Sequence, residues 1–217
     1  MLDVYELLGK ITTKHVENKD RLEIFGLEKL PKDGPYIIAS NHIGSLETIL
    51  IPTIILNNHN KRVYNLVAEK IYRMCGKKLS ERLGFIPVLE GDKSRCLDVA
   101  VERLKQGNIL NIFPEGARSR PKKTKHQLLR GKTGVARLAL KAQVPVIPFG
   151  YHGPHDNNIL MLLKHWYISK QKVKAGFGDL LSFEEHYEIE HTKDILESAV
   201  RKIMQEIAKV SGQEYIH

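Results

Sequence analysis

The chain has 217 residues, of which 42% are hydrophobic and 27% are charged, a composition typical of folded globular proteins rather than disordered or fibrous ones. No linker-like, low-complexity or repeated segment divides this length, so we expect one domain. The formal net charge of +9 favours anionic partners.

Cysteine usage and apolar run lengths indicate the compartment. Cys75 and Cys96 are the two cysteines, and they lie in unlike contexts without metal-ligand spacing. This fits a reducing compartment, and we predict neither as a ligand or a nucleophile. The start MLDVYELLGK lacks the basic lead and apolar core of a signal peptide. The longest apolar stretch, residues 46–56, is half of the about 20 residues that span a bilayer. We therefore expect a cytoplasmic protein that does not cross a membrane on its own.

The chain begins with a helical pattern over residues 2–16. Leu2, Tyr5, Leu8 and Ile11 recur every three residues, with polar residues opposite them. Packing on the body of the domain is the default interpretation of such a stripe, and lying in a membrane interface is the alternative. We assign residues 1–20 to an N-terminal amphipathic helix and residues 21–217 to the main domain.

Short apolar runs then alternate with helical patterns. The predicted strands are Leu22–Phe25, Tyr36–Ala39, Val63–Ala68, Phe85–Leu89, Ile109–Phe113, Val144–Phe149 and Val173–Phe177. The predicted helices cover residues 45–57, 70–82, 94–106, 130–142 and 192–210. This order predicts a single α/β domain with a largely parallel, mixed sheet of about seven strands flanked by helices. In such sheets the loops after the carboxyl ends of the strands carry the chemistry.

The first motif, NHIGSLE, follows a predicted strand and opens a helix. His42 can act there as a general base, with the Glu47 carboxylate fixing its tautomer and steadying the imidazolium. An alternative is purely structural: Ser45 is a good helix N-cap, and Glu47 suits the first helical turn.

The second motif, FPEGARSR, ends a strongly apolar strand. Gly116 allows a sharp turn, and Arg118 and Arg120 can bind a phosphate in bidentate fashion. An ordinary strand-ending turn with solvated arginines is the alternative. Two buried strands, GFIPV from Gly84 and VPVIPFG from Val144, complete the set.

The four motifs, in this order and spacing, resemble those of the lysophosphatidic acid acyltransferase family, NHxxxxD, GFIPV with a following arginine, FPEGTRSR and VPVIPxG. The resemblance runs from about Arg21 to about Leu181. It implies that His42 is the general base and that Glu47 takes the place of the family's aspartate. It also implies that Glu115 and Arg118 bind the acceptor's phosphate and glycerol end, with Gly116 shaping the loop of this substrate-binding site. It implies that no metal and no acyl-enzyme intermediate take part, and that an acyl-CoA or acyl carrier protein thioester is the donor.

Three positions depart from the family pattern. Glu47 is one methylene longer than the family's aspartate, and Ala117 replaces the threonine of FPEGTRSR. Glu90 stands where the family has the arginine that follows GFIPV, so Lys93 or Arg95 is our candidate for the missing cation. We interpret these departures as shared machinery with an altered acceptor pocket.

A basic stretch suggests how the chain reaches its lipid. Residues 116–155 contain no acid, and their nine basic residues equal the net charge: Arg118, Arg120, Lys122, Lys123, Lys125, Arg130, Lys132, Arg137 and Lys141. We expect peripheral binding to an anionic membrane on its inner face. A nucleic-acid partner is not expected, because the stretch interleaves no aromatics and carries no known binding module.

The predicted function is therefore acyl transfer from the thioester to the free hydroxyl of 1-acylglycerol-3-phosphate or a related lysolipid. The alternative is a catalytically weak lipid- or thioester-binding homologue, which Glu47 and Glu90 favour.

Overall fold

The computed structural model describes residues 4–7, 10, 22–118, 126–155 and 172–217. These residues form a seven-stranded sheet in the order β1-β7-β6-β2-β5-β3-β4. The strands are β1 (Leu22–Phe25), β2 (Tyr36–Ser40), β3 (Val63–Ala68), β4 (Phe85–Val88), β5 (Ile109–Ile112), β6 (Val146–His152) and β7 (Val173–Phe177). Five neighbouring pairs are parallel and β6–β7 is antiparallel. The predicted single α/β domain with a largely parallel sheet is confirmed.

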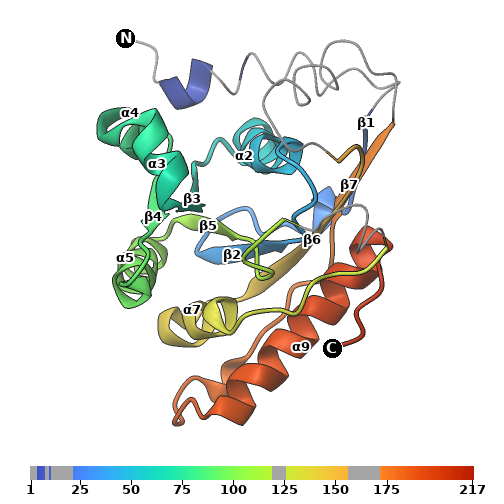
Figure 1. Cartoon of the computed structure of the whole chain (residues 1–217). Coiled ribbons are helices and arrows are strands. Elements are labelled where there is room, and N and C mark those ends of the chain that lie inside the picture. The colour runs from blue at the N-terminus through green and yellow to red at the C-terminus, as the bar shows by residue number, and fades with distance from the viewer. Residues whose placement is uncertain (1–3, 8–9, 11–21, 119–125, 156–171) are drawn as a thin grey trace.

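Helices cover both faces of this sheet (Figure 1). Helix α2 (Leu46–His59) lies on one face, and α5 (Lys93–Lys105), α7 (Gly134–Ala142) and α9 (Lys193–Ser211) lie on the other. Alternate side chains of β2 belong to the two cores: Tyr36 and Ile38 pack with α2, whereas Ile37 and Ala39 pack with the other three helices. A strand buried on both faces reads as a continuous apolar run, which explains why this sequence predicts it well.

Two predicted helices have different bounds in the structure. The helix expected over residues 70–82 is two helices, α3 (Glu69–Cys75) and α4 (Lys77–Arg82). Gly76 separates them with a φ of 77° and a ψ of 149°, a backbone conformation that favours glycine. The helix expected over residues 130–142 starts at Gly134. The chain before it is held by a hydrogen bond from the Lys132 N–H to the Pro114 carbonyl. Short 3-10 turns at Leu27–Lys29 and Glu184–His186 complete the described elements.

One residue of the predicted N-terminal stripe packs on the domain. Residues 4–7 are helical, and Tyr5 is buried. Its hydroxyl accepts a hydrogen bond of 2.8 Å from the Val63 N–H, and the Arg62 guanidinium lies 5.0 Å from its ring centroid. Leu2, Leu8 and Ile11 lie outside the described residues, so the helix over residues 2–16 and the boundary at residue 20 stay predictions. Among the helices that the structure describes, none combines the length and the apolar composition needed to cross a bilayer.

Candidate active site

The His42 loop follows β2 at the carboxyl edge of the parallel strands. The preceding residue, Asn41, is buried and fixes where the loop begins. Its amide nitrogen donates to the Tyr151 carbonyl (2.8 Å) and to Gln213 Oε1 (2.6 Å), and its oxygen accepts from the Tyr151 N–H (2.8 Å). These bonds tie the loop to β6 and to the end of α9. Asn41 was not among the predicted site residues, although it stands in the first motif directly before His42.

His42 and Glu47 form the pair that the first motif predicts. His42 Nδ1 lies 2.8 Å from Glu47 Oε1, and Glu47 is fully buried. A carboxylate at neutral pH only accepts hydrogen bonds, so Nδ1 carries the proton and donates it to Glu47. The lone pair of the ring is then on Nε2, the atom that can take a proton from a substrate hydroxyl.

Glu47 also organises the backbone of the loop. Its Oε1 accepts hydrogen bonds from the N–H groups of Ile43 (2.9 Å) and Gly44 (2.8 Å). Oε2 is buried and has no hydrogen-bond partner within the described parts of the chain. Ser45 occupies the N-cap of α2 without a side-chain capping bond. The Glu47 carboxylate therefore binds both the His42 ring and the backbone of the loop. A residue that served only the first turn of α2 would not make these contacts.

The second motif meets the first because β5 is the parallel neighbour of β2. The Phe113 ring stacks on the His42 ring, with centroids 4.1 Å apart and planes 21° apart. The Arg118 Nε–H donates a long hydrogen bond of 3.4 Å to His42 Nε2. Since a guanidinium can only donate, this contact agrees with a lone pair on Nε2. Gly116 turns the chain between these residues with a φ of +65°.

Glu115 positions the two loops rather than facing the open site. It is buried, and its Oε1 accepts from the His42 N–H while Oε2 accepts from the Leu129 N–H, both at 2.8 Å. Burial raises the pKa of Glu115 to about 7, although both backbone hydrogen bonds act to lower it. Both carboxylate oxygens of Glu115 accept backbone hydrogen bonds. The expected contact between Glu115 and the acceptor stays a prediction.

The part of the chain that carries the four motifs matches a known protein family. A family model described as Acyltransferase matches residues 21–152, which is more than half of the chain. The chain belongs to the acyltransferase family.

Two individual relatives are similar to this acyltransferase. The 1-acyl-sn-glycerol-3-phosphate acyltransferase of Bacillus subtilis is 24% identical over 162 residues, which cover 74% of this acyltransferase and 73% of that one. The DGAT1/2-independent enzyme synthesizing storage lipids of Homo sapiens is 29% identical over 132 residues, which cover 58% of this acyltransferase and 38% of the human protein.

A solved structure shares the fold. The 1-acyl-sn-glycerophosphate (LPA) acyltransferase PlsC from Thermotoga maritima aligns with a TM-score of 0.64 over 93% of this acyltransferase and 77% of that chain, at 20% identity. Together with the family match and the Bacillus relative, it confirms the resemblance to the lysophosphatidic acid acyltransferases that the motifs indicate.

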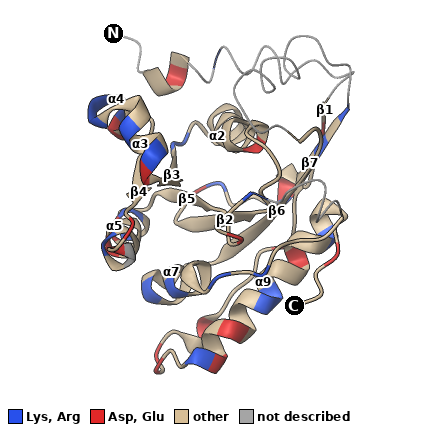
Figure 2. Cartoon of the chain, viewed as in Figure 1, with Lys and Arg blue, Asp and Glu red and all other residues tan. Residues whose placement is uncertain are grey.

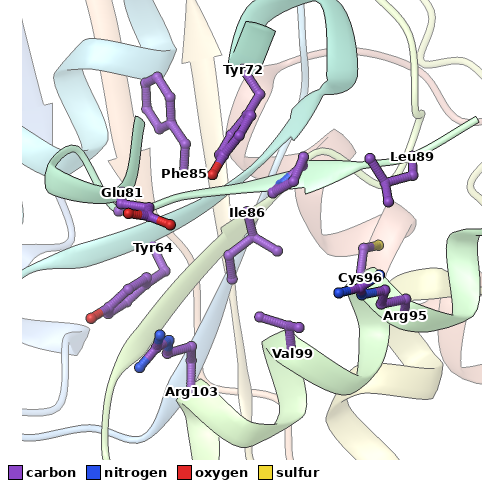
Figure 3. A pocket seen from close by; sticks show the side chains of 12 residues that line it. Tyr64, Tyr72, Glu81, Phe85, Ile86, Leu89, Arg95, Cys96, Val99 and Arg103 are labelled. Carbon is purple, nitrogen blue, oxygen red and sulfur yellow. The ribbon is translucent and has the colours of Figure 1, made fainter. Parts of the chain in front are cut away.

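The structure does not bring Arg95 next to His42. Arg95 of this acyltransferase lines a cavity of about 220 Å³ beside β4 (Figure 3), with Arg103 of α5 and with Tyr72 and Glu81 of α3 and α4. Strand β4 lies three strands from β2, which is about 14 Å at a strand spacing of about 4.8 Å. Lys93 is the first residue of α5, and its side chain lies outside the described part of the structure. A role in acceptor binding stays a prediction for both.

Lys132, predicted only as one of the nine basic residues of the acid-free stretch, lies against the second motif. A Cβ on Gly116 would lie 2.5 Å from Lys132 Nζ, so the Lys132 side chain crosses the turn of the second motif. Its distance in sequence from that motif gave no signal of this placement. Lys132 therefore adds positive charge to the loop that carries Arg118.

Proposed function

We propose that this acyltransferase moves a fatty acyl group from acyl-CoA or an acyl carrier protein thioester to the free hydroxyl of 1-acylglycerol-3-phosphate or a related lysolipid. The observation that carries the proposal is the His42–Glu47 pair, with its Nε2 lone pair directed toward Arg118. The Bacillus relative, which bears the name of this activity, supports the choice of acceptor.

The site supplies a base and a charge that steadies it. The acceptor hydroxyl binds at His42 Nε2, which removes its proton as the oxygen attacks the thioester carbonyl carbon. The carboxylate of Glu47, 2.8 Å from Nδ1, stabilises the imidazolium that forms. The tetrahedral intermediate then collapses, the carbon–sulfur bond breaks, and His42 returns the proton to the leaving thiolate. An ester and a free thiol are the products, and the enzyme regains its starting protonation state.

Arg118 provides the anion-binding side of the same site. Its 3.4 Å contact with His42 is long for a hydrogen bond, so a phosphate can draw the guanidinium away at little cost. Lys132 lies across the adjoining turn and adds a second cation at this side. Glu90 at the end of β4 adds no positive charge, so we place the acceptor phosphate near Arg118 and Lys132 rather than beside β4.

We further propose that the enzyme works as a peripheral protein on the cytoplasmic face of the membrane. Its acceptor is a lipid, and its net charge of +9 favours an anionic surface.

An acceptor panel tests the proposal. Purified protein is given labelled acyl-CoA or acyl carrier protein thioester together with 1-acylglycerol-3-phosphate, other lysophospholipids or glycerol-3-phosphate, and the labelled lipids are separated. We expect label in the diacyl product of a lysolipid, with phosphate-bearing acceptors preferred. Thioester binding without transfer to any acceptor would favour the catalytically weak homologue instead.

A further inference from the structure

Helices α3 and α4 expose apolar side chains that the fold does not use. The described residues expose seven large hydrophobic side chains, and three of them, Ile71, Met74 and Leu79, belong to this helix pair. Met74 is 73% exposed. Ile71 and Met74 lie three residues apart, on one face of α3. Leu79 lines a surface depression together with Cys75, which follows Met74 at the end of α3, so the exposed face continues across Gly76 from α3 to α4.

The same helices are cationic. The fourteen residues from Glu69 to Arg82 contain five basic and two acidic residues. Arg73 is neutralised by Glu69, with 2.6 Å between Nη2 and Oε1. The other four, Lys70, Lys77, Lys78 and Arg82, make no ion pair with any described residue. In Figure 2 the blue Lys and Arg positions recur along the ribbon of α3 and α4, at the edge of the molecule away from α9.

This helix pair begins at the catalytic edge of the sheet. Strand β3 runs parallel to β5, and β5 runs parallel to β2, so all three end at the same edge. Helix α3 starts directly after β3, as the His42 loop starts directly after β2. The start of α3, with Lys70 and Ile71, therefore lies at the edge where the acceptor binds, and α4 leads back to the start of β4 at the opposite edge.

We propose that the surface formed by Ile71, Met74 and Leu79 with Lys70, Lys77, Lys78 and Arg82, here called the α3–α4 surface, docks on an anionic lipid bilayer. The apolar side chains enter the region between head groups and acyl chains, and the ammonium and guanidinium groups bind lipid phosphates. Helices that carry both exposed apolar residues and cations without an ion pair to a described residue match an anionic bilayer better than an anionic macromolecule. An anionic macromolecule would bind the cations and leave the apolar side chains in water. The inference rests on the proposed function, because a lysolipid acceptor resides in that bilayer.

Charge and salt test the first half of the proposal. Binding is measured by co-sedimentation with vesicles of phosphatidylcholine alone and of equimolar phosphatidylcholine and phosphatidylglycerol. We expect wild type to bind the anionic vesicles and hardly the neutral ones, with binding weakened by salt. The double variant Lys77→Gln, Lys78→Gln is expected to bind about 10- to 30-fold more weakly. The matched control is Lys193→Gln, Arg201→Gln on the exposed side of α9, which we expect to bind like wild type.

The apolar half is tested by Met74→Ser. We expect it to lose about three- to tenfold in binding, and to lose most of the part that persists at high salt. A third variant, Lys122→Gln, Lys123→Gln, Lys125→Gln, removes lysines of the acid-free stretch, which lie outside the described residues. Loss of binding in this variant, with Lys77→Gln, Lys78→Gln unchanged, would overturn the proposal, as would failure of wild type to bind anionic vesicles.

Cys75 allows the surface to be located directly. It is half-buried in α3, whereas Cys96 is buried and burial raises the pKa of its thiol, so a thiol-reactive fluorophore labels Cys75 first. We expect a blue shift and protection from an aqueous quencher on anionic vesicles. The same label on Gln205→Cys of α9, in a Cys75→Ser background, should not respond. An unchanged Cys75 signal on bound protein would overturn the α3–α4 surface.

Turnover separates this inference from the proposed function. The vesicle variants are assayed with a soluble short-chain acceptor, and we expect them to retain the wild-type rate. Inactive wild-type protein that still docks through α3–α4 would contradict the proposed function and leave the docking surface standing.

Discussion

Replacing Glu47 with glutamine changes the active-site charge while leaving the shape of the side chain nearly the same. Oε1 of Glu47 accepts three hydrogen bonds, from His42 Nδ1 and from the N–H groups of Ile43 and Gly44. These donors require an oxygen at that position, so the amide oxygen of the variant takes it. The amide nitrogen then occupies the buried place of Oε2, which has no partner among the described residues.

The cost to catalysis follows from the lost charge. Unit charges about 4 Å apart attract by about 4 kcal/mol at an effective dielectric constant of about 20. An amide oxygen retains part of this interaction with the imidazolium, which leaves a loss of about 3 kcal/mol, or about 10²-fold in rate. The unpaired buried amide nitrogen destabilises the fold by about 1–3 kcal/mol.

Glu47→Asp is the matched comparison, because it keeps the charge and restores the family's residue. We expect it to retain activity within about tenfold of wild type. Release of free thiol from acyl-CoA in the presence of lysolipid measures the rates, and thermal unfolding measures stability. Equal activity of the Gln and Asp variants would show that the charge of Glu47 has no catalytic part.

Three further predictions concern the second motif. Arg118→Lys should raise the KM for the acceptor about tenfold and leave that for acyl-CoA nearly unchanged, because lysine lacks the planar fork that grips phosphate; equal losses for both substrates would remove the assignment. The raised pKa of Glu115 makes ionisation costly in the fold, so stability should fall by about 3 kcal/mol as pH rises from about 4.5 to about 7. Urea unfolding should show this slope in wild type and not in Glu115→Gln, and a shared slope would assign it to other groups. Gly116→Ala should lower the unfolding free energy by about 1 kcal/mol, because its φ of +65° disfavours a side chain and its Cβ would meet Lys132; an unchanged denaturation midpoint would contradict this.

The parts of the fold that sequence analysis predicted well are those governed by burial. All seven strands were predicted, and β2 and β5 most clearly, because strands buried on both faces form continuous apolar runs between helical patterns. The split at Gly76 was missed, because a single glycine also fits within a helix. The antiparallel pairing of β7 with β6 could not be read from the composition of either strand.

In the candidate site, too, contacts within one motif were predictable and contacts between distant segments were not. The pairing of His42 with Glu47 was predictable because the two residues lie five apart in one motif. The contacts of Asn41 with Tyr151 and of Gly116 with Lys132 join residues distant in sequence, so only the folded chain brings them together. Arg95 follows GFIPV in sequence and lies beside the same strand, β4, in the structure; only the strand order shows that β4 is three strands from β2 and the His42 loop.

The central claim is that His42 is the general base of acyl transfer, and the most direct measurement is the turnover of His42→Ala. Glu47 Oε1 keeps its hydrogen bonds from the Ile43 and Gly44 N–H groups in this variant, so the variant should fold, as circular dichroism and thermal unfolding can verify. Losing a general base costs about 10²–10⁴-fold in rate, and we predict a fall of that size in acyl transfer to a lysolipid with folding preserved. A folded His42→Ala protein that transfers acyl groups at close to the wild-type rate would contradict the mechanism.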